Sequence, residues 1–228
     1  MDSEETYIMN DTNDDMDYNK MVQTYTKMDG ILAIAVYIVF FMSFYLFIQL
    51  AIKTGVYLKN LDKIIAITMV FIIVRKRNQG LNSIGFSNRN LGKSVLLGFT
   101  LSLLFIVVPN LSLFNKNITS PKFYGEVVYF FLVISFTEEL LFRGYIQTRM
   151  HGLIKSKYLS VFVVGFMFAI GHVPLDLIKY QIDIATYLNI DPFRIPKIMV
   201  THVIFHLLYK RYNSIAAPII LHGFLDLL

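Results

Sequence analysis

The sequence predicts an all-α fold: a polytopic transmembrane helix bundle of about six to seven helices. Of the 228 residues, 55% are hydrophobic and 16% are charged, and the mean hydropathy is +0.55. From residue 30 onward, apolar stretches alternate with short charged turns. This pattern is typical of one integral membrane domain, because an apolar run of about 20 residues crosses a bilayer as a helix.

The first 29 residues differ from the rest in charge. They hold eight acidic residues against two lysines, although the whole chain carries a net charge of +5. We expect residues 1–29 to form an acidic, disordered tail. We expect residues 30–228 to form one helical bundle, with its motif-bearing core at 90–228. The tail has neither the basic start nor the early apolar core of a signal peptide.

Four apolar stretches predict helices in the first two thirds of the chain. The first, 31–52, carries no formal charge, and the second is 54–74. The third, 91–108, ends before Pro109, because proline cannot continue a helix without losing a hydrogen bond. The fourth, 123–150, is the longest.

The remainder predicts three further helices. The fifth is 158–173, and we expect Pro174 to end it. Residues 174–196 predict a mixed loop that can hold a short interfacial helix. The sixth helix is expected at 197–209, and the seventh from residue 214 to the end.

Lysine and arginine near helix ends indicate orientation in a membrane. The turns at 75–93 and 149–157 together carry eight of these residues. We therefore expect a multi-pass protein of the cell membrane with a cytoplasmic N-terminus. The opposite orientation retains nearly as many cations, so the difference is small.

Polar residues inside the predicted helices are the most informative feature. Charge at membrane depth is costly and usually functional. At 1.5 Å of rise per residue, Glu138, His172 and His222 lie roughly 12 to 21 Å from the cytoplasmic side. They can therefore meet in one buried site. The residues are Glu138, Glu139, Arg143, His172, His222 and Asp226.

Some of these residues also have a structural interpretation. Glu139 and Arg143 have the i,i+4 spacing of an ordinary helical ion pair. His222 and Asp226 have the same spacing and could form a structural hydrogen bond. Glu138 has no partner within its own turn, which favours function over structure.

His202 and His206 have the HxxxH spacing of a metal-ligand pair. The helix of a zinc protease also carries a glutamate beside its two histidines, and no acid accompanies this pair. We therefore favour helix packing or cavity lining for this pair.

Taken together, the motifs resemble a known family. They read E-E-x-x-x-R, then F-x-x-x-H, then H-x-x-x-D, and are formed by Glu138, Glu139, Arg143, Phe168, His172, His222 and Asp226. This set is similar to the CPBP family of CAAX proteases and bacteriocin-processing enzymes, also called Abi, which includes type II CAAX prenyl endopeptidases. The resemblance covers about residues 90–228.

The resemblance implies an intramembrane endopeptidase. In such an enzyme Glu138 activates water, Glu139 and Arg143 hold the site, and the histidines bind or polarise the substrate carbonyl. The chain has no cysteine, so a thiolate nucleophile is excluded and a base acting through water is the natural route.

Whether a metal takes part is open from the sequence. The family has been described both as metalloproteases and as metal-free glutamate enzymes. Glu138, His172 and His222 could form a two-histidine, one-carboxylate Zn²⁺ site. Relatives commonly carry Asn where this chain has Asp226. Because Asn is a poor metal ligand, we slightly favour the metal-free version. An ionised Asp only accepts hydrogen bonds, which favours Asp226 as a group that orients His222 or ligates a metal.

The expected partners are the lipid bilayer and a membrane-associated peptide or protein substrate, with no nucleic acid. The resemblance implies maturation of secreted peptides or pheromones, or self-immunity to bacteriocins. Two alternatives are a non-catalytic membrane scaffold or regulator, and a transporter with a Glu/His proton relay. Retention of all motif residues argues against a scaffold. The lack of repeated hydropathy between the two halves argues against a transporter.

Overall fold

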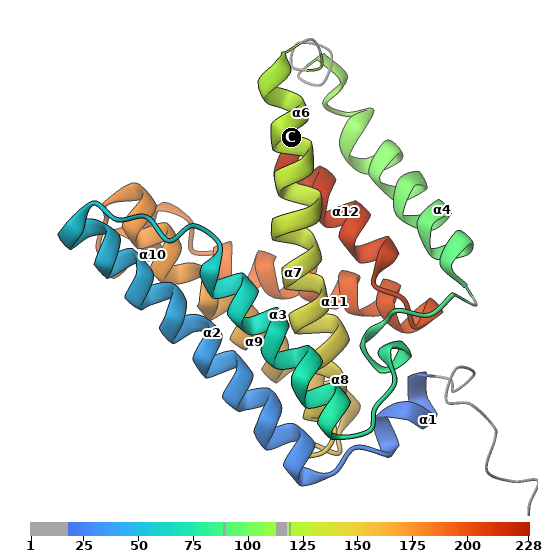
Figure 1. Ribbon diagram of the computed structural model, residues 1–228. Coiled ribbons are helices and arrows are strands. Elements are labelled where there is room, and N and C mark those ends of the chain that lie inside the picture. The colour runs from blue at the N-terminus through green and yellow to red at the C-terminus, as the bar shows by residue number, and fades with distance from the viewer. Residues whose placement is uncertain (1–17, 89, 113–117, 119) are drawn as a thin grey trace, which may run out of the picture.

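The structure, a computed structural model, describes residues 18–88, 90–112, 118 and 120–228. Within these ranges every regular element is helical, which confirms the predicted all-α fold (Figure 1). Two helices, Lys27–Thr54 and Lys157–Ile178, are long and apolar enough to cross a membrane. No other helix in the described ranges meets both conditions. Six or seven crossings therefore stay a prediction.

The N-terminal part forms α1 (Tyr18–Gln23), α2 (Lys27–Thr54) and α3 (Leu61–Lys76). Thr26 caps α2, because its hydroxyl accepts a hydrogen bond from the backbone N–H of Asp29. Such a cap satisfies a free N–H group at the helix start. Helix α2 ends at Gly55, whose φ of 72° is a common terminating conformation. The turn that follows makes α3 begin at Leu61, later than the predicted residue 54.

The predicted disordered tail is wrong for residues 18–29. Tyr18, Met21, Val22 and Tyr25 are buried, and Tyr18 packs edge-on against the ring of His206. Apolar side chains in this segment bury enough surface to hold it on the bundle. Residues 1–17, which hold most of the acidic charge, lie outside the described residues.

One continuous helix runs from Pro121 to Met150 and confirms the fourth predicted helix. It consists of α6 (Pro121–Val128), η4 (Tyr129–Ser135), α7 (Phe136–Glu138), η5 (Glu139–Ile146) and α8 (Gln147–Met150). The stretches η4 and η5 are π-helical. Figure 1 shows this helix passing through the centre of the molecule, with α12 beside its upper part and α2 and α3 beside its lower part.

The other elements are η2 (Leu81–Ile84), α4 (Leu91–Ser102), η3 (Leu103–Val107), α9 (Lys157–Tyr180), α10 (Ile184–Ile190), α11 (Arg194–Tyr212) and α12 (Ala216–Leu227). Helix α10 is the short helix expected within 174–196. The prediction that Pro174 ends the fifth helix is wrong, because α9 continues to Tyr180. A proline removes one backbone hydrogen bond, and packing against a neighbour can hold the helix together. For α9 that neighbour is α11.

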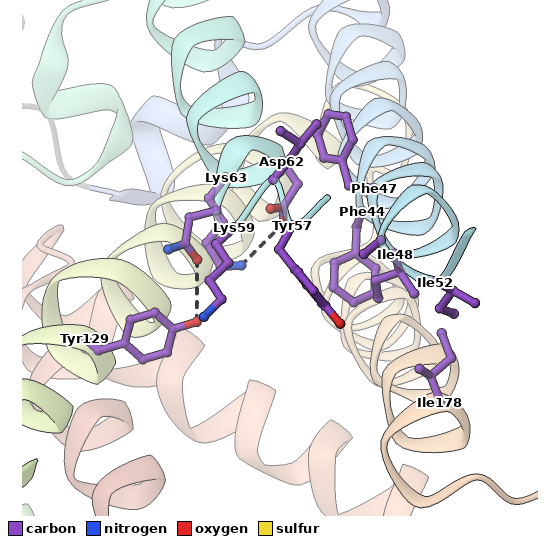
Figure 2. Close-up of a pocket in the computed structure, with 13 residues that line it drawn as sticks. Phe44, Phe47, Ile48, Ile52, Tyr57, Lys59, Asp62, Lys63, Tyr129 and Ile178 are labelled. Atoms are coloured by element: carbon purple, nitrogen blue, oxygen red, sulfur yellow. Dashed lines mark hydrogen bonds and ion pairs between the residues drawn. The ribbon is translucent and has the colours of Figure 1, made fainter. Parts of the chain in front are cut away.

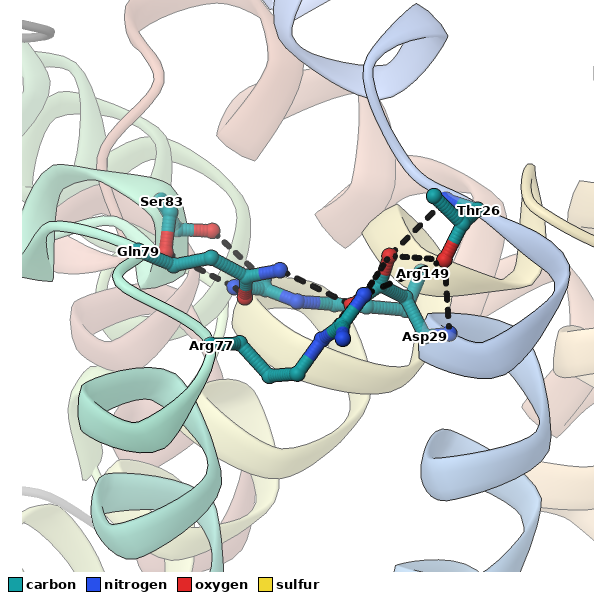
Figure 3. Close-up of polar contacts among 6 residues, drawn as sticks. All are labelled: Thr26, Asp29, Arg77, Gln79, Ser83 and Arg149. Carbon is teal, nitrogen blue, oxygen red and sulfur yellow. Dashed lines mark hydrogen bonds and ion pairs between the residues drawn. The ribbon is translucent and has the colours of Figure 1, made fainter.

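A buried arginine joins three helix ends. Arg149 is fully buried, and its guanidinium donates to the carbonyl of Ser83 at 2.7 Å and to the side chain of Gln79 at 2.7 Å. Gln79 in turn donates to Asp29, which also binds Arg77 (Figure 3). The start of α2 and the ends of α3 and α8 therefore lie at one end of the bundle. Arg149 is a structural anchor rather than the exposed turn charge that orientation arguments assume.

Candidate active site

The centre of the site is a carboxylate shared by two donors. Glu139 and Arg143 lie one turn apart on η5, and both side chains are fully buried. Arg143 Nη1 donates to Glu139 Oε1 at 2.7 Å. His222 Nδ1, from α12, lies 2.7 Å from the same oxygen. Because an ionised carboxylate only accepts hydrogen bonds, Nδ1 carries the proton. Glu139 thus ties the arginine of the first motif to the histidine of the last one.

The other nitrogen of His222 faces two further acids. His222 Nε2 lies 3.4 Å from Asp226 Oδ2 and 3.9 Å from Glu138 Oε2. The imidazole therefore stands between Glu139 on one side and Glu138 with Asp226 on the other. We expected Asp226 to orient His222 from the sequence. The shorter contact is with Glu139, which sequence spacing paired only with Arg143.

Consecutive glutamates point in different directions, because successive residues of a helix are about 100° apart. Glu139 is fully buried, whereas 19% of the Glu138 side chain is exposed and faces a cavity. π-helical turns occur frequently at functional sites, and the two π-helical stretches lie on either side of Glu138. Glu138 Oε2 has no hydrogen-bond partner among the described residues.

His172 reaches the same cavity from α9. Its Nδ1 lies 2.8 Å from the backbone carbonyl oxygen of Phe168. A carbonyl can only accept, so Nδ1 is the donor and Nε2 of the neutral ring is an acceptor. His172 can therefore accept a hydrogen bond from a substrate amide. It polarises a carbonyl only after it is protonated.

Two aromatic rings hold the arginine. The guanidinium carbon of Arg143 lies 4.3 Å from the ring centroid of Phe168 and 4.9 Å from that of Phe205. The Phe205 ring also lies 5.2 Å from the His222 ring. Cations over aromatic faces are stabilised most where water is excluded. Phe168 belongs to the motif that the sequence singled out. Phe205, on α11, was missed.

The cavity has a volume of about 380 Å³, within the usual range of ligand sites. Beyond Glu138, His172, His222 and Asp226, its lining includes two ion pairs. Lys63 contacts Asp62 at 3.3 Å, and Arg194 contacts Asp176 at 2.6 Å. His202 and His206 do not line it. His202 is fully buried against Gln147, with Nε2 at 3.1 Å from the amide oxygen, which fits the predicted packing role.

The metal ligands considered from the sequence do not fit a metal site here. Within the described part of the chain, no three His, Cys, Asp or Glu side chains are grouped so as to hold a metal ion. Nδ1 of His172 and of His222 is engaged, by a carbonyl and a carboxylate respectively, which leaves Nε2 of each ring to face the cavity.

Comparison with known proteins identifies the C-terminal half. Residues 120–228 match the family model described as Type II CAAX prenyl endopeptidase Rce1-like. No curated protein and no solved structure matches the chain. The match starts at the helix that carries Glu138 and extends to the last residue, so it includes all six predicted site residues. It confirms the resemblance to CAAX proteases, although over a shorter range than 90–228. Residues 120–228 form a domain of the Rce1-like type II CAAX prenyl endopeptidase family.

Proposed function

We propose that this protein is an intramembrane endopeptidase in which Glu138 activates a water molecule to hydrolyse a peptide bond. One observation carries the proposal. The Glu138 side chain lines the cavity and is 19% exposed, while its neighbour Glu139 is held by Arg143 and His222 behind it. A carboxylate with no hydrogen-bond partner of its own, beside a cavity that can hold water, can act as a general base.

The proposed reaction has two proton transfers. Glu138 takes a proton from water as the oxygen attacks the substrate carbonyl, and a tetrahedral intermediate with a negative oxygen forms. The C–N bond then breaks, and Glu138 returns its proton to the leaving amine. His222 Nε2 and a protonated Asp226 are the donors that can stabilise the oxyanion. His172 Nε2 accepts a hydrogen bond from the substrate backbone.

The buried pair supports this reaction without taking part in proton transfer. Glu139 and Arg143 are fully buried and bonded to each other. Their role is to fix His222 in one ring orientation, because Nδ1 is bonded to Glu139. Preorganised donors of this kind need no rearrangement when charge develops.

We further propose a multi-pass protein of the cell membrane with a cytoplasmic N-terminus. Two apolar helices and a domain of a membrane protease family support the membrane location. The start of α2 and the ends of α3 and α8 lie at one end of the bundle, and this grouping supports the proposed orientation. Maturation of a membrane-associated peptide is the role that we favour. Bacteriocin self-immunity and metalloprotease chemistry, which the resemblance also implied, find no support in the comparisons.

The test is cleavage by purified protein in liposomes, read by mass spectrometry against a mixture of membrane-anchored and signal-peptide-like substrates. Wild type should cleave at least one substrate, and Glu138→Gln should lose about 10² to 10⁴ of the rate, the usual contribution of a general base. Glu126→Gln is the matched control, because Glu126 lies on the same helix but pairs with Lys122 at the surface. No cleavage by wild type would favour the scaffold alternative. Proton flux without cleavage would favour a transporter.

A further inference from the structure

A second, larger hollow lies beside the catalytic cavity. It has a volume of about 690 Å³, and we call it the apolar trough. One wall is formed by Phe44, Phe47 and Ile48 of α2, and Ile178 of α9 faces them (Figure 2). These side chains offer no hydrogen-bonding group. The trough therefore suits an apolar chain.

One end of the trough is polar. Lys63 pairs with Asp62 at 3.3 Å, and the hydroxyl of Tyr129 donates to the Asn60 side chain at 3.5 Å (Figure 2). Lys59 lies at the same end, is exposed, and makes no ion pair with the described residues. An ammonium group with no acidic partner favours an anionic group in the occupant.

The trough and the catalytic cavity adjoin each other. Phe44, Asp62, Lys63 and Tyr129 line both hollows. An extended molecule in the trough therefore lies next to the cavity that contains Glu138. An occupant with a peptide bond a few residues from its apolar part would place that bond at the catalytic groups.

We propose that the apolar trough binds an unmodified run of apolar residues that flanks the scissile bond, and that Lys59 receives an acidic residue of the same peptide. This inference rests on the proposed function and names its substrate class. The adjoining cavity favours a peptide over a phospholipid, because the lipid has no peptide bond to place beside Glu138.

The first test compares two peptides that differ only in the flank, four leucines against four serines. Wild type should cleave the leucine peptide with a kcat/KM at least about tenfold higher, since a single methylene in an apolar pocket is worth about 10 to 200 fold. Ile48→Trp should narrow the trough and reduce this preference at least several-fold. Leu46→Trp is the matched control, because Leu46 is 57% exposed on the same helix and does not line the trough.

The second test exchanges charges. Lys59→Glu should lower kcat/KM several-fold for a leucine peptide with Glu beside the flank, and should raise it for the same peptide with Lys there. Both effects should shrink at 0.5 M salt, because exposed charges are screened over a few ångströms at that ionic strength. Equal rates for the two peptides with both proteins would overturn the role of Lys59.

A binding experiment keeps the inference separate from catalysis. A photoreactive leucine in the flank should label residues 44–52 of wild type and of Glu138→Gln, but not of Ile48→Trp. Labelling without any cleavage by wild type would support the trough and refute the proposed function. Labelling by a photoreactive phospholipid or a farnesylated peptide that the leucine peptide cannot displace would overturn the assignment of the trough.

Discussion

Replacing Arg143 by methionine should cost more stability than any surface substitution on the same helix. Arg143 and Glu139 are both fully buried, and their contact is 2.7 Å. Removing one member of a buried ion pair leaves an uncompensated charge and costs about 3 to 5 kcal/mol. The lost contacts with two aromatic rings add about 0.5 to 2 kcal/mol each. Arg143→Met should therefore lower the free energy of unfolding by at least about 3 kcal/mol.

The double variant Glu139→Met/Arg143→Met gives a sharper test. An isolated buried pair can be replaced by apolar side chains with little or no loss of stability. Here His222 Nδ1 also depends on Glu139, so the double variant leaves a buried donor unpaired at a cost of about 1 to 3 kcal/mol. We expect it to be more stable than either single variant but less stable than wild type.

The assay is denaturant unfolding in detergent, followed by helical circular dichroism. Lys122→Met serves as the control, because Lys122 and Glu126 have the same i,i+4 spacing on the same helix but are exposed. An exposed pair is worth at most about 1 kcal/mol. If Arg143→Met is as stable as Lys122→Met, the arginine is solvated and the buried site described above is wrong.

Three further changes probe other parts of the molecule. Phe205→Leu should lower kcat about three- to thirtyfold with little change in KM, since one cation–π contact of about 0.5 to 2 kcal/mol and a ring against His222 are lost; an unchanged kcat would refute a positioning role. Arg149→Met should lower the free energy of unfolding by at least about 1 to 3 kcal/mol, because the buried carbonyl of Ser83 loses its donor. Unfolding measured as above checks this. Asp226→Asn should keep cleavage within about tenfold of wild type, which the cleavage rates of the two proteins in liposomes check.

Sequence reasoning singled out the candidate site residues because the bilayer makes charge conspicuous. Glu138 and Arg143 stand out in an apolar helix, and depth counting placed Glu138 level with His172 and His222. The structure brings these residues around one cavity or directly behind it. Their catalytic roles stay predictions. The helices were predictable for a similar reason, because long apolar runs have few alternatives to helix in a membrane.

Other features left no signal in the sequence. Phe205 is one of 20 phenylalanines, and only the packing of α11 against the site gives it a role. Arg149 stands near the end of an apolar stretch beside lysine-bearing turns, so it resembled an exposed cation until its contacts with Ser83 and Gln79 were known. Pro174 is a local helix breaker that tertiary packing overrides. For each of these three residues, a contact between segments far apart in the sequence decides its structural role.

The charge balance of the cluster explains why Asp226→Asn should be tolerated. Glu138, Glu139 and Asp226 are three acids, while Arg143 and His222 can supply at most two positive charges. A mostly buried cluster with unequal charge is costly, so a neutral side chain at residue 226 should be accepted. A protonated Asp donates a hydrogen bond as an Asn amide does, which makes Asp226 equivalent to the Asn of its relatives. A loss of more than about 100-fold in Asp226→Asn would instead show that the carboxylate itself is needed.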